Sequence, residues 1–393
     1  RPADSGCGVL RRGEEWRGQR RCQRVDERRC SPIAATMGPV GARASSAARS
    51  ARVIADAAVV GAGVIGASTA LALARRGHSV CVIDKNRGAG LGSTSYSSGV
   101  CRQFYSVKES VQFAWEGYHF WEQWRDFVGV RDDRGYASLR ETGGLIFDHG
   151  SSRDFLETTT AHCADVGVPF DRLSRLELEA HYGPASPFRM CLDSFGPPTP
   201  IDDPRFGEVS QRDCISGAVF FPKTGYVSDP KLAVDNLRLA AEATGRCTFA
   251  FGQPVTGVTL DGGRMSGLTL SDGTRVSAPI VVNAAGPHSA EVTSLVFSAA
   301  DAPPNDMVVW PRPLRQEVAY VTAPPGIDYE SSGPAVCDLD AGVYFRPEVG
   351  NKILIGSVEP ECDPLEWVDT VDEASPALSS VHTTHIMRLA MRL

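Results

Sequence analysis

The chain has 393 residues, enough for two domains or one large composite core. Its 42% hydrophobic and 22% charged residues are typical of a globular protein and exclude wholesale disorder and fibrous repeats. The 47 acidic and 40 basic residues give a formal net charge of −7, which argues against a nucleic-acid partner because such a surface would repel a phosphate backbone.

The first 55 residues are predicted to form a leader before the folded part of the chain. Residues 1–36 mix arginines with acidic residues and show no apolar periodicity, which indicates disorder. Residues 37–55 contain arginines, serines and alanines but no Asp or Glu, the composition of a mitochondrial transit peptide. We therefore expect a mitochondrial protein; the alternative is a flexible basic leader without an address on a cytoplasmic protein.

A strand, a helix and a second strand are predicted over residues 57–60, 64–76 and 79–83. Residues 57–74 carry no charge and are long enough on paper to span a membrane. Glycines interrupt this run where a strand would turn into a helix, so a βαβ unit explains it better.

Three glycines in the spacing G-x-G-x-x-G separate the first strand from the helix. Gly61 permits the sharp turn, Gly63 lets the backbone approach a pyrophosphate, and Gly66 allows close packing of helix and strand. The helix N-terminus then directs free N–H groups toward the phosphates. Asp84, at the end of the second strand, can accept hydrogen bonds from the adenosine ribose. This pattern predicts a dinucleotide site, but by itself it does not separate FAD from NAD.

The middle of the chain is predicted to mix short strands with helices. A loop rich in Ser, Thr and Gly over residues 88–99 precedes an aromatic helical region over 106–127. Residues 136–221 combine short strands such as 144–147 with helices and a proline-rich loop at 197–204. This mixture is typical of a substrate domain.

The last part of the chain is predicted to contain a helix, an antiparallel meander and further strands. The helix is expected over residues 231–243, with Asp229 as its N-cap and a proline in its first turn. Apolar and polar residues alternate over 255–276 around Asp-Gly turns, which favours antiparallel strands. Other elements are expected as strands at 280–282, 353–355 and around Tyr320 and Tyr344, and as a helix at 381–393. His382 and His385 lie three residues apart on that helix, and without further ligands we interpret them as a surface pair.

Several stretches resemble the D-amino-acid-oxidase-like superfamily of FAD-dependent oxidoreductases, in particular sarcosine oxidase, glycine oxidase and dimethylglycine dehydrogenase. They are residues 61–85, 92–95, 281–286 and 288–290. The resemblance implies FAD as the cofactor and the following contacts: Gly61, Gly63, Val64, Ile65, Gly66, Asp84, Lys85, Ser93, Thr94, Val255, Ala285 and Gly286. In that family the Ser/Thr loop contacts the flavin pyrophosphate, the Asn-Ala-Ala-Gly turn lies against the cofactor, and Val255 would contact adenine. An NAD dehydrogenase would leave the loop and the turn unexplained.

The resemblance also implies an architecture. We expect an α/β fold with a Rossmann-like FAD-binding domain into which a mixed-sheet substrate domain is inserted. Residues 56–110 and 225–310 would form the discontinuous FAD-binding domain, and residues 111–224 and 311–393 the substrate domain. The family ordinarily continues past the position of Leu393 with a segment that returns to the Rossmann domain, so we expect a truncated C-terminal family segment.

Arg102 is the first-choice substrate residue. It resembles the arginine with which sarcosine oxidase pairs the substrate carboxylate, and a guanidinium offers two parallel donors to such a group. The alternative is an arginine paired with a surface acid. Tyr105 is a candidate for lining the same pocket, although an aromatic residue beside Phe104 is more often core. Arg346 is a weaker candidate for a second anion contact. Sarcosine oxidase has a further arginine where this chain has Gly99, which implies different electrostatics.

Two functions from different classes follow. The first is an FAD-dependent oxidoreductase that oxidises the C–N bond of a secondary or N-methylated amino acid by hydride transfer to flavin. Its electron acceptor would be oxygen, an electron-transfer flavoprotein or the quinone chain. Residues 101–104 and 344–347 also resemble a mitochondrial subgroup of FAD-dependent oxidoreductase-domain proteins linked to assembly of respiratory complex I. That resemblance implies the alternative, an assembly factor that retains FAD structurally and contacts respiratory-complex subunits.

Overall fold

The computed structural model describes residues 52–186, 188–300, 308–373 and 377–393, all within one compact unit. The predicted leader and transit peptide therefore lie almost entirely outside the described residues. Strand β1 (Arg52–Ile54) pairs in parallel with β13 (Arg275–Ser277). The expectation that the first 55 residues form a leader before the folded part is thus wrong for β1, because this strand pairs with a segment far away in the sequence and leaves no local signal.

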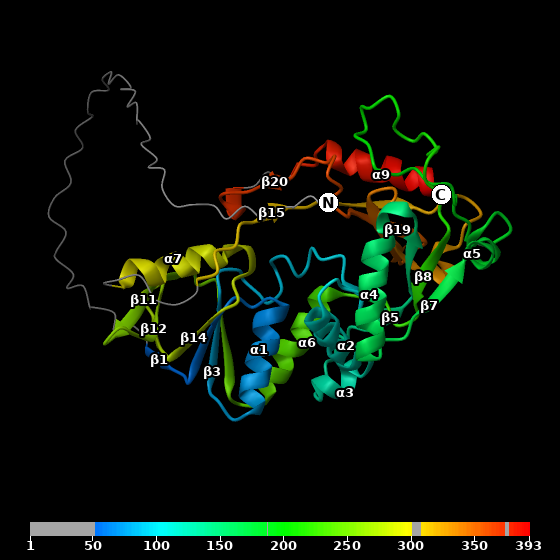
Figure 1. The fold of residues 1–393 in the computed structure, drawn as a ribbon. Coiled ribbons are helices and arrows are strands. Elements are labelled where there is room, and N and C mark those ends of the chain that lie inside the picture. Colours follow the sequence, from blue (N-terminus) through cyan, green and yellow to red (C-terminus); the bar gives the residue numbers. More distant parts are fainter. Residues whose placement is uncertain (1–51, 187, 301–307, 374–376) are drawn as a thin grey trace, which may run out of the picture. The chain divides into compact units, whose positions relative to one another are not determined.

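A four-stranded parallel sheet carries the glycine turn (Figure 1). Its strands, in spatial order, are β10 (Cys247–Phe251), β3 (Val80–Asp84), β2 (Ala57–Val60) and β14 (Ile280–Asn283). Helices α1 (Val64–Arg75) and α6 (Pro230–Ala243) pack together on one face, over Val59, Val80 and Val82. The alternate side chains pack on the other face, namely Ala58, Val60, Cys81 and Ile83. Both faces are covered, which explains why these strands are apolar throughout.

The predicted meander forms the layer on that other face. Strands β11 (Val255–Asp261), β12 (Arg264–Leu270) and β13 are antiparallel, and β1 completes their sheet. Leu268, Leu270 and Val276 from the meander join the side chains of the parallel sheet in one core. Helix α7 (Ser289–Ala299) packs on β11.

Local signals set the ends of two helices. Asp229 caps α6 as predicted, since its carboxylate accepts a hydrogen bond from the backbone N–H of Leu232 at 2.9 Å. The aromatic region is two helices, α2 (Lys108–Glu122) and α3 (Trp124–Val128). The second ends at Gly129, whose φ of +70° reverses the chain.

The second large sheet has seven strands and is mixed. Its strands, in spatial order, are β16 (Val318–Thr322), β19 (Lys352–Ser357), β18 (Val343–Glu348), β17 (Ala335–Asp338), β6 (Gly144–Asp148), β8 (Gly217–Phe221) and β7 (Asp171–Ser174). Neighbouring strands are antiparallel except β17 and β6. The sheet confirms the mixed-sheet part of the expected α/β fold class.

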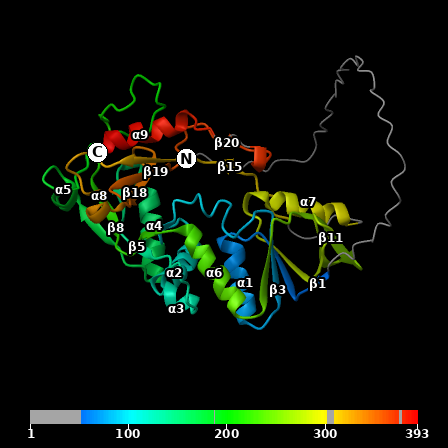
Figure 2. The same cartoon turned by 180° about the vertical axis from the view of Figure 1, so that it is seen from behind.

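Helices cover both faces of the mixed sheet. Helices α2 and α4 (Arg153–Val166) pack against Ile146, Val219 and Phe221 on one face. The other face packs against α5 (Arg175–Tyr182), α8 (Tyr329–Ser332) and α9 (Ser380–Arg392). Figure 2 shows α9 and β19 from the opposite side. None of the described helices has the length and apolar character needed to cross a membrane.

Two smaller sheets complete the described fold. Strands β4 (Val100–Cys101), β9 (Gly225–Val227) and β5 (Leu139–Glu141) form an antiparallel sheet in that order. Strands β15 (Leu314–Arg315) and β20 (Glu366–Trp367) form an antiparallel pair. Strand β4 leads directly into the segment that contains Arg102.

A buried ion pair network joins the end of α9 to the mixed sheet. The guanidinium of Arg392 is fully buried and donates to the carboxylates of Asp338 at 2.6 Å and Asp340 at 2.9 Å. It also donates to the backbone oxygens of Cys191 at 2.6 Å and Asp193 at 2.9 Å. Two carboxylates thus compensate one cation inside the core, and the remaining donors are satisfied.

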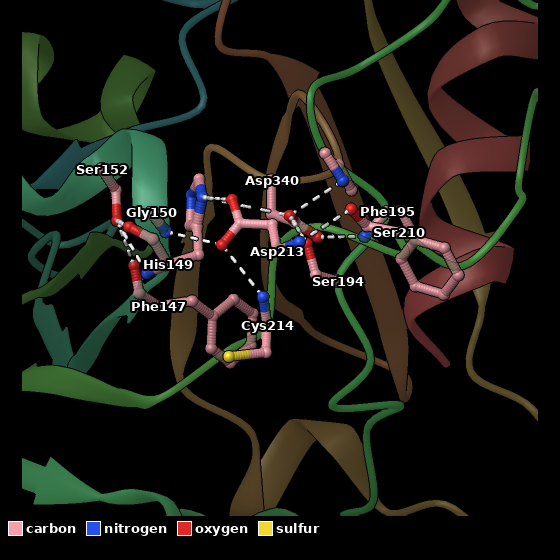
Figure 3. Close-up of polar contacts among 12 residues, drawn as sticks. Phe147, His149, Gly150, Ser152, Ser194, Phe195, Ser210, Asp213, Cys214 and Asp340 are labelled. Carbon is pink, nitrogen blue, oxygen red and sulfur yellow. Dashed lines mark hydrogen bonds and ion pairs between the residues drawn. The ribbon is translucent and has the colours of Figure 1, made fainter.

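Asp340 extends this network into the long loop over residues 190–216 (Figure 3). Its carboxylate accepts hydrogen bonds from Ser194 Oγ at 2.6 Å and from the backbone N–H of Phe195 at 2.7 Å. Nδ1 of the buried His149 lies 4.0 Å from the same carboxylate and 3.7 Å from that of Asp213. The loop is therefore held by buried charge more than by strand pairing.

Candidate active site and cofactor site

The glycine turn leaves no room for side chains at two positions. Gly61 has a φ of +104°, and a Cβ there would lie 2.3 Å from the backbone oxygen of Ala284. A Cβ on Gly66 would lie 1.8 Å from the backbone oxygen of Gly61. Gly63 is the N-cap of α1, whose first turn contains no acidic residue. A bare backbone cradle at a helix N-terminus suits an anionic pyrophosphate.

Asp84 lies next to this cradle at the carboxyl end of β3. Its two carboxylate oxygens accept hydrogen bonds from the backbone N–H groups of Ala62 at 2.7 Å and Asn86 at 2.8 Å. Each oxygen has a further lone pair. Asp84 therefore orders the turn and keeps acceptor capacity for ribose hydroxyls, which remains its predicted role.

The Ser/Thr loop reaches the start of α1. Thr94 Oγ1 accepts a hydrogen bond from the backbone N–H of Val64 at 3.1 Å. Ser93, the preceding residue, is exposed, and Ile65 in the first turn of α1 is 66% exposed. The exposed apolar side chain of Ile65 lies beside the cradle and is therefore available to contact a bound cofactor.

The Asn-Ala-Ala-Gly turn lies beside the glycine turn. The backbone N–H of Ala284 donates to the backbone oxygen of Val60 at 2.8 Å, because β14 pairs with β2. Gly286 has a φ of +58°. Ala285 and Val255 are half-buried against the core between the parallel sheet and the meander.

Lys85 has a protein partner. Its ammonium donates to the carboxylate of Asp372 at 2.6 Å, and this ion pair lowers the pKa of Asp372. Asp372 also lies 3.6 Å from His288 Nε2. Because the ammonium is paired with Asp372, we expect the main chain of Lys85, next to Asp84, to make the predicted contact with the cofactor. The glycine cradle, the Asp84 carboxylate and the Thr94 hydroxyl together fit a dinucleotide.

Arg102 is half-buried and has no anionic partner in the described part of the chain. Its guanidinium carbon lies 4.6 Å from the centroid of the Tyr105 ring and 5.2 Å from that of Phe104. Among the described residues it forms neither a hydrogen bond nor an ion pair, so the acid that the surface-pair alternative requires is not found there. Burial raises the pKa of the nearby Cys337 thiol to about 11, and the positive charge of Arg102 opposes this rise.

Arg346 is only 3% exposed and is already engaged. Its Nε donates to the backbone oxygen of Ser98 at 2.7 Å, and its Nη1 pairs with Glu348 at 3.0 Å. Its guanidinium carbon lies 4.0 Å above the ring of Tyr226. Arg346 thus ties β18 to the loop before β4, and its charge is compensated by Glu348. These partners leave Arg346 less available than Arg102 for a substrate anion, and its contact with one stays a prediction.

Strand register places Tyr344 and Tyr320 on the same face of the mixed sheet as Arg346. The sequence predicted strands at both tyrosines and gave them no role in the site. Cys337 pairs with Tyr344, and Tyr344 pairs with Gly356. A Cβ on Gly356 would lie 2.5 Å from Tyr344 Oη, so glycine leaves the space that this ring occupies. Arg346 and Tyr320 both pair with Leu354 in the neighbouring row. Alternation along the predicted strands was the signal that would have grouped them.

The histidine pair on α9 corrects one prediction. His385 is fully buried, and both of its ring nitrogens lack a hydrogen-bond partner among the described residues. Burial lowers its pKa. The prediction of a surface pair is therefore wrong for His385, because the apolar side of α9 packs on the mixed sheet. The described residues contain no group of three or more His, Cys, Asp or Glu side chains that could hold a metal ion.

Comparisons with known proteins agree with this geometry. A family model described as FAD dependent oxidoreductase (DAO) matches residues 56–393. The D-amino acid dehydrogenase of Paramagnetospirillum magneticum is 28% identical over 257 residues, which cover 58% of this chain and 60% of that protein. The chain thus matches less than two thirds of that relative's length.

Solved structures share the fold. L-proline dehydrogenase from P. horikoshii superposes with a TM-score of 0.65 at 17% identity, covering 87% of this chain and 77% of the other. Glycine oxidase from Geobacillus kaustophilus superposes with a TM-score of 0.61 at 23% identity, covering 87% and 78%. With the family model matching most of the chain, this protein belongs to the FAD dependent oxidoreductase (DAO) family, and its cofactor is FAD.

Proposed function

We propose that the protein oxidises the C–N bond of an amino acid, with secondary or N-methylated amino acids as the preferred substrates. The observation that carries this proposal is the half-buried guanidinium of Arg102, which has no acid partner among the described residues. A guanidinium binds a carboxylate by donating two parallel hydrogen bonds from its N–H groups. The resemblance to sarcosine oxidase and dimethylglycine dehydrogenase supports the choice of amine.

The described residues divide the work between cofactor and substrate. When bound, FAD supplies the hydride acceptor. The Gly61–Gly66 turn and the N-terminus of α1 would hold its pyrophosphate, and Asp84 its ribose. Arg102 would hold the substrate carboxylate and so fix the position of the carbon that bears the amine. The rings of Phe104 and Tyr105 stack on the guanidinium, and stacking leaves its N–H groups available for a carboxylate.

Anaerobic stopped-flow mixing tests the proposal. The FAD-loaded full chain is mixed with glycine, sarcosine and N,N-dimethylglycine, and with sarcosinamide as the control that lacks a carboxylate. We expect flavin bleaching with at least one of the N-methylated acids and much slower bleaching with sarcosinamide. No bleaching by any amino acid, or equal rates with sarcosinamide, would contradict the proposed substrate class.

The second candidate, assembly of respiratory complex I by a mitochondrial protein, stays a prediction from the sequence. Its basis is the composition of residues 37–55 and the subgroup resemblance at residues 101–104 and 344–347. Oxygen, an electron-transfer flavoprotein and the quinone chain remain the proposed electron acceptors. Stable FAD binding without reduction by any amine would favour the assembly function.

A further inference from the structure

The side chain of Arg102 has little to hold it in place. Its guanidinium only stacks on the rings of Tyr105 and Phe104, and no hydrogen bond to a described residue fixes its direction. Stacking tolerates sliding of the charged group over a ring, whereas a two-point grip on a carboxylate does not. The position of Arg102 therefore depends on how firmly its backbone is anchored.

The next residue, Gln103, is held by hydrogen bonds to both the nitrogen and the oxygen of its side-chain amide. It is 1% exposed. Its Nε2 donates to the backbone oxygen of Lys223 at 3.1 Å, and its Oε1 accepts from Thr224 Oγ1 at 3.0 Å. Lys223 and Thr224 belong to the turn that joins β8 of the mixed sheet to β9 of the three-stranded sheet.

Further contacts make this anchor rigid. Cys163 Sγ in α4 lies 3.8 Å from the backbone oxygen of Gln103. Thr224 is 1% exposed, and its backbone oxygen accepts a hydrogen bond from Gly143 at 3.0 Å, just before β6. A buried amide that loses either partner leaves an unsatisfied polar group, so one orientation is strongly preferred.

We propose that Gln103 is the positioning residue for Arg102, holding it through the Thr224 and Lys223 contacts in the place where it meets the substrate carboxylate. This inference rests on the proposed function, since it assigns Arg102 a carboxylate ligand. Gln103 itself touches no substrate, and its effect passes through the backbone that it shares with Arg102.

Two substitutions test the anchor from opposite sides. Thr224→Val keeps the shape of the side chain and removes only the donor to Gln103. Gln103→Met keeps the length and removes both amide contacts. Thr384→Val is the matched control, because Thr384 is 7% exposed and its hydroxyl donates one hydrogen bond within α9, to Ser380.

The measurement is titration of the FAD-loaded full chain with three carboxylates, each paired with its neutral amide, followed by the flavin spectrum. The pairs are acetate and acetamide, methoxyacetate and methoxyacetamide, and benzoate and benzamide. We expect Thr224→Val to raise Kd for the carboxylates about 5- to 10-fold, as the loss of one buried hydrogen bond implies, and Gln103→Met, which loses two, to raise it at least as much. The amide Kd, the FAD content and the Thr384→Val control should stay at wild-type values.

The Arg102→Ala background separates the possible failures. If Gln103 acts through Arg102, neither anchor substitution should change Kd further in that background. An additive effect there, or a wild-type carboxylate preference in both anchor variants, would overturn the positioning role and leave the proposed function standing. Equal binding of carboxylates and amides by the wild type, or an unchanged preference in Arg102→Ala, would overturn the proposed function and this inference with it.

Discussion

Replacement of Arg102 offers the most direct test of the active-site assignment. In Arg102→Ala a bound carboxylate loses its charged, hydrogen-bonded partner, which costs about 2–5 kcal/mol where the pair is buried. Because Arg102 is half-buried, we expect the lower end of this range, about 2 kcal/mol, or roughly 30-fold. Arg102→Lys keeps the charge but loses the planar two-point grip, so it should fall between alanine and wild type.

The assay is single-turnover flavin reduction under anaerobic conditions over a range of sarcosine concentrations. The efficiency of reduction should fall in the order wild type, Arg102→Lys, Arg102→Ala, while FAD content stays constant. Arg172→Ala is the matched control, since Arg172 on β7 is an exposed arginine paired with Glu157 at 3.2 Å. Loss of flavin from Arg102→Ala, with unchanged reduction per bound flavin, would show that Arg102 serves the structure or the cofactor.

Four further predictions concern the cofactor cradle and the core. Asp84→Ala should weaken FAD binding by about 1.5–3 kcal/mol in a fluorescence titration, and unchanged affinity would remove Asp84 from the site. Gly66→Ala should abolish FAD loading, because its Cβ would lie 1.8 Å from a backbone oxygen; a fully loaded variant would contradict this close approach. Arg392→Met leaves two buried carboxylates uncompensated and should cost about 3–5 kcal/mol of unfolding free energy in chemical denaturation, whereas a change below about 1 kcal/mol would refute that account. Burial lowers the pKa of His385, so the unfolded chain binds a proton more readily, and stability should be complete above about pH 6.5 and fall as the pH drops below it. His385→Gln should flatten this fall in pH-dependent melts and His382→Gln should not; equal slopes in both would contradict the buried neutral imidazole.

The sequence predicted local elements well and long-range partners poorly. The glycine spacing, the Asp229 cap and the alternation of residues 255–276 are local patterns whose physical causes lie within a few residues. The pairing of β1 with β13 could not be predicted in this way, because it depends on contacts between distant segments. The burial of His385 could not be predicted for the same reason, because it depends on which side of α9 packs against the mixed sheet.

The candidate site shows the same limit. Arg102 was chosen from a resemblance, but only the structure shows that it has no acid partner among the described residues, whereas Arg346 is paired with Glu348. Strand register places Tyr344 beside Cys337 and Gly356, which the sequence alone did not predict. Residue type suggested the chemistry, and the three-dimensional neighbours decided which arginine is available for it.

The charged core beneath the loop over residues 190–216 has a consequence for local unfolding. The loop has little strand pairing of its own and depends on the carboxylate of Asp340, which in turn is compensated by Arg392 at the end of α9. Opening the loop would remove the hydrogen bonds that it makes to the buried charges of Asp340 and Arg392, so loop and helix end should open together as one cooperative unit. Their amide hydrogens should therefore exchange with the solvent at matched rates, slower than those of an ordinary surface loop.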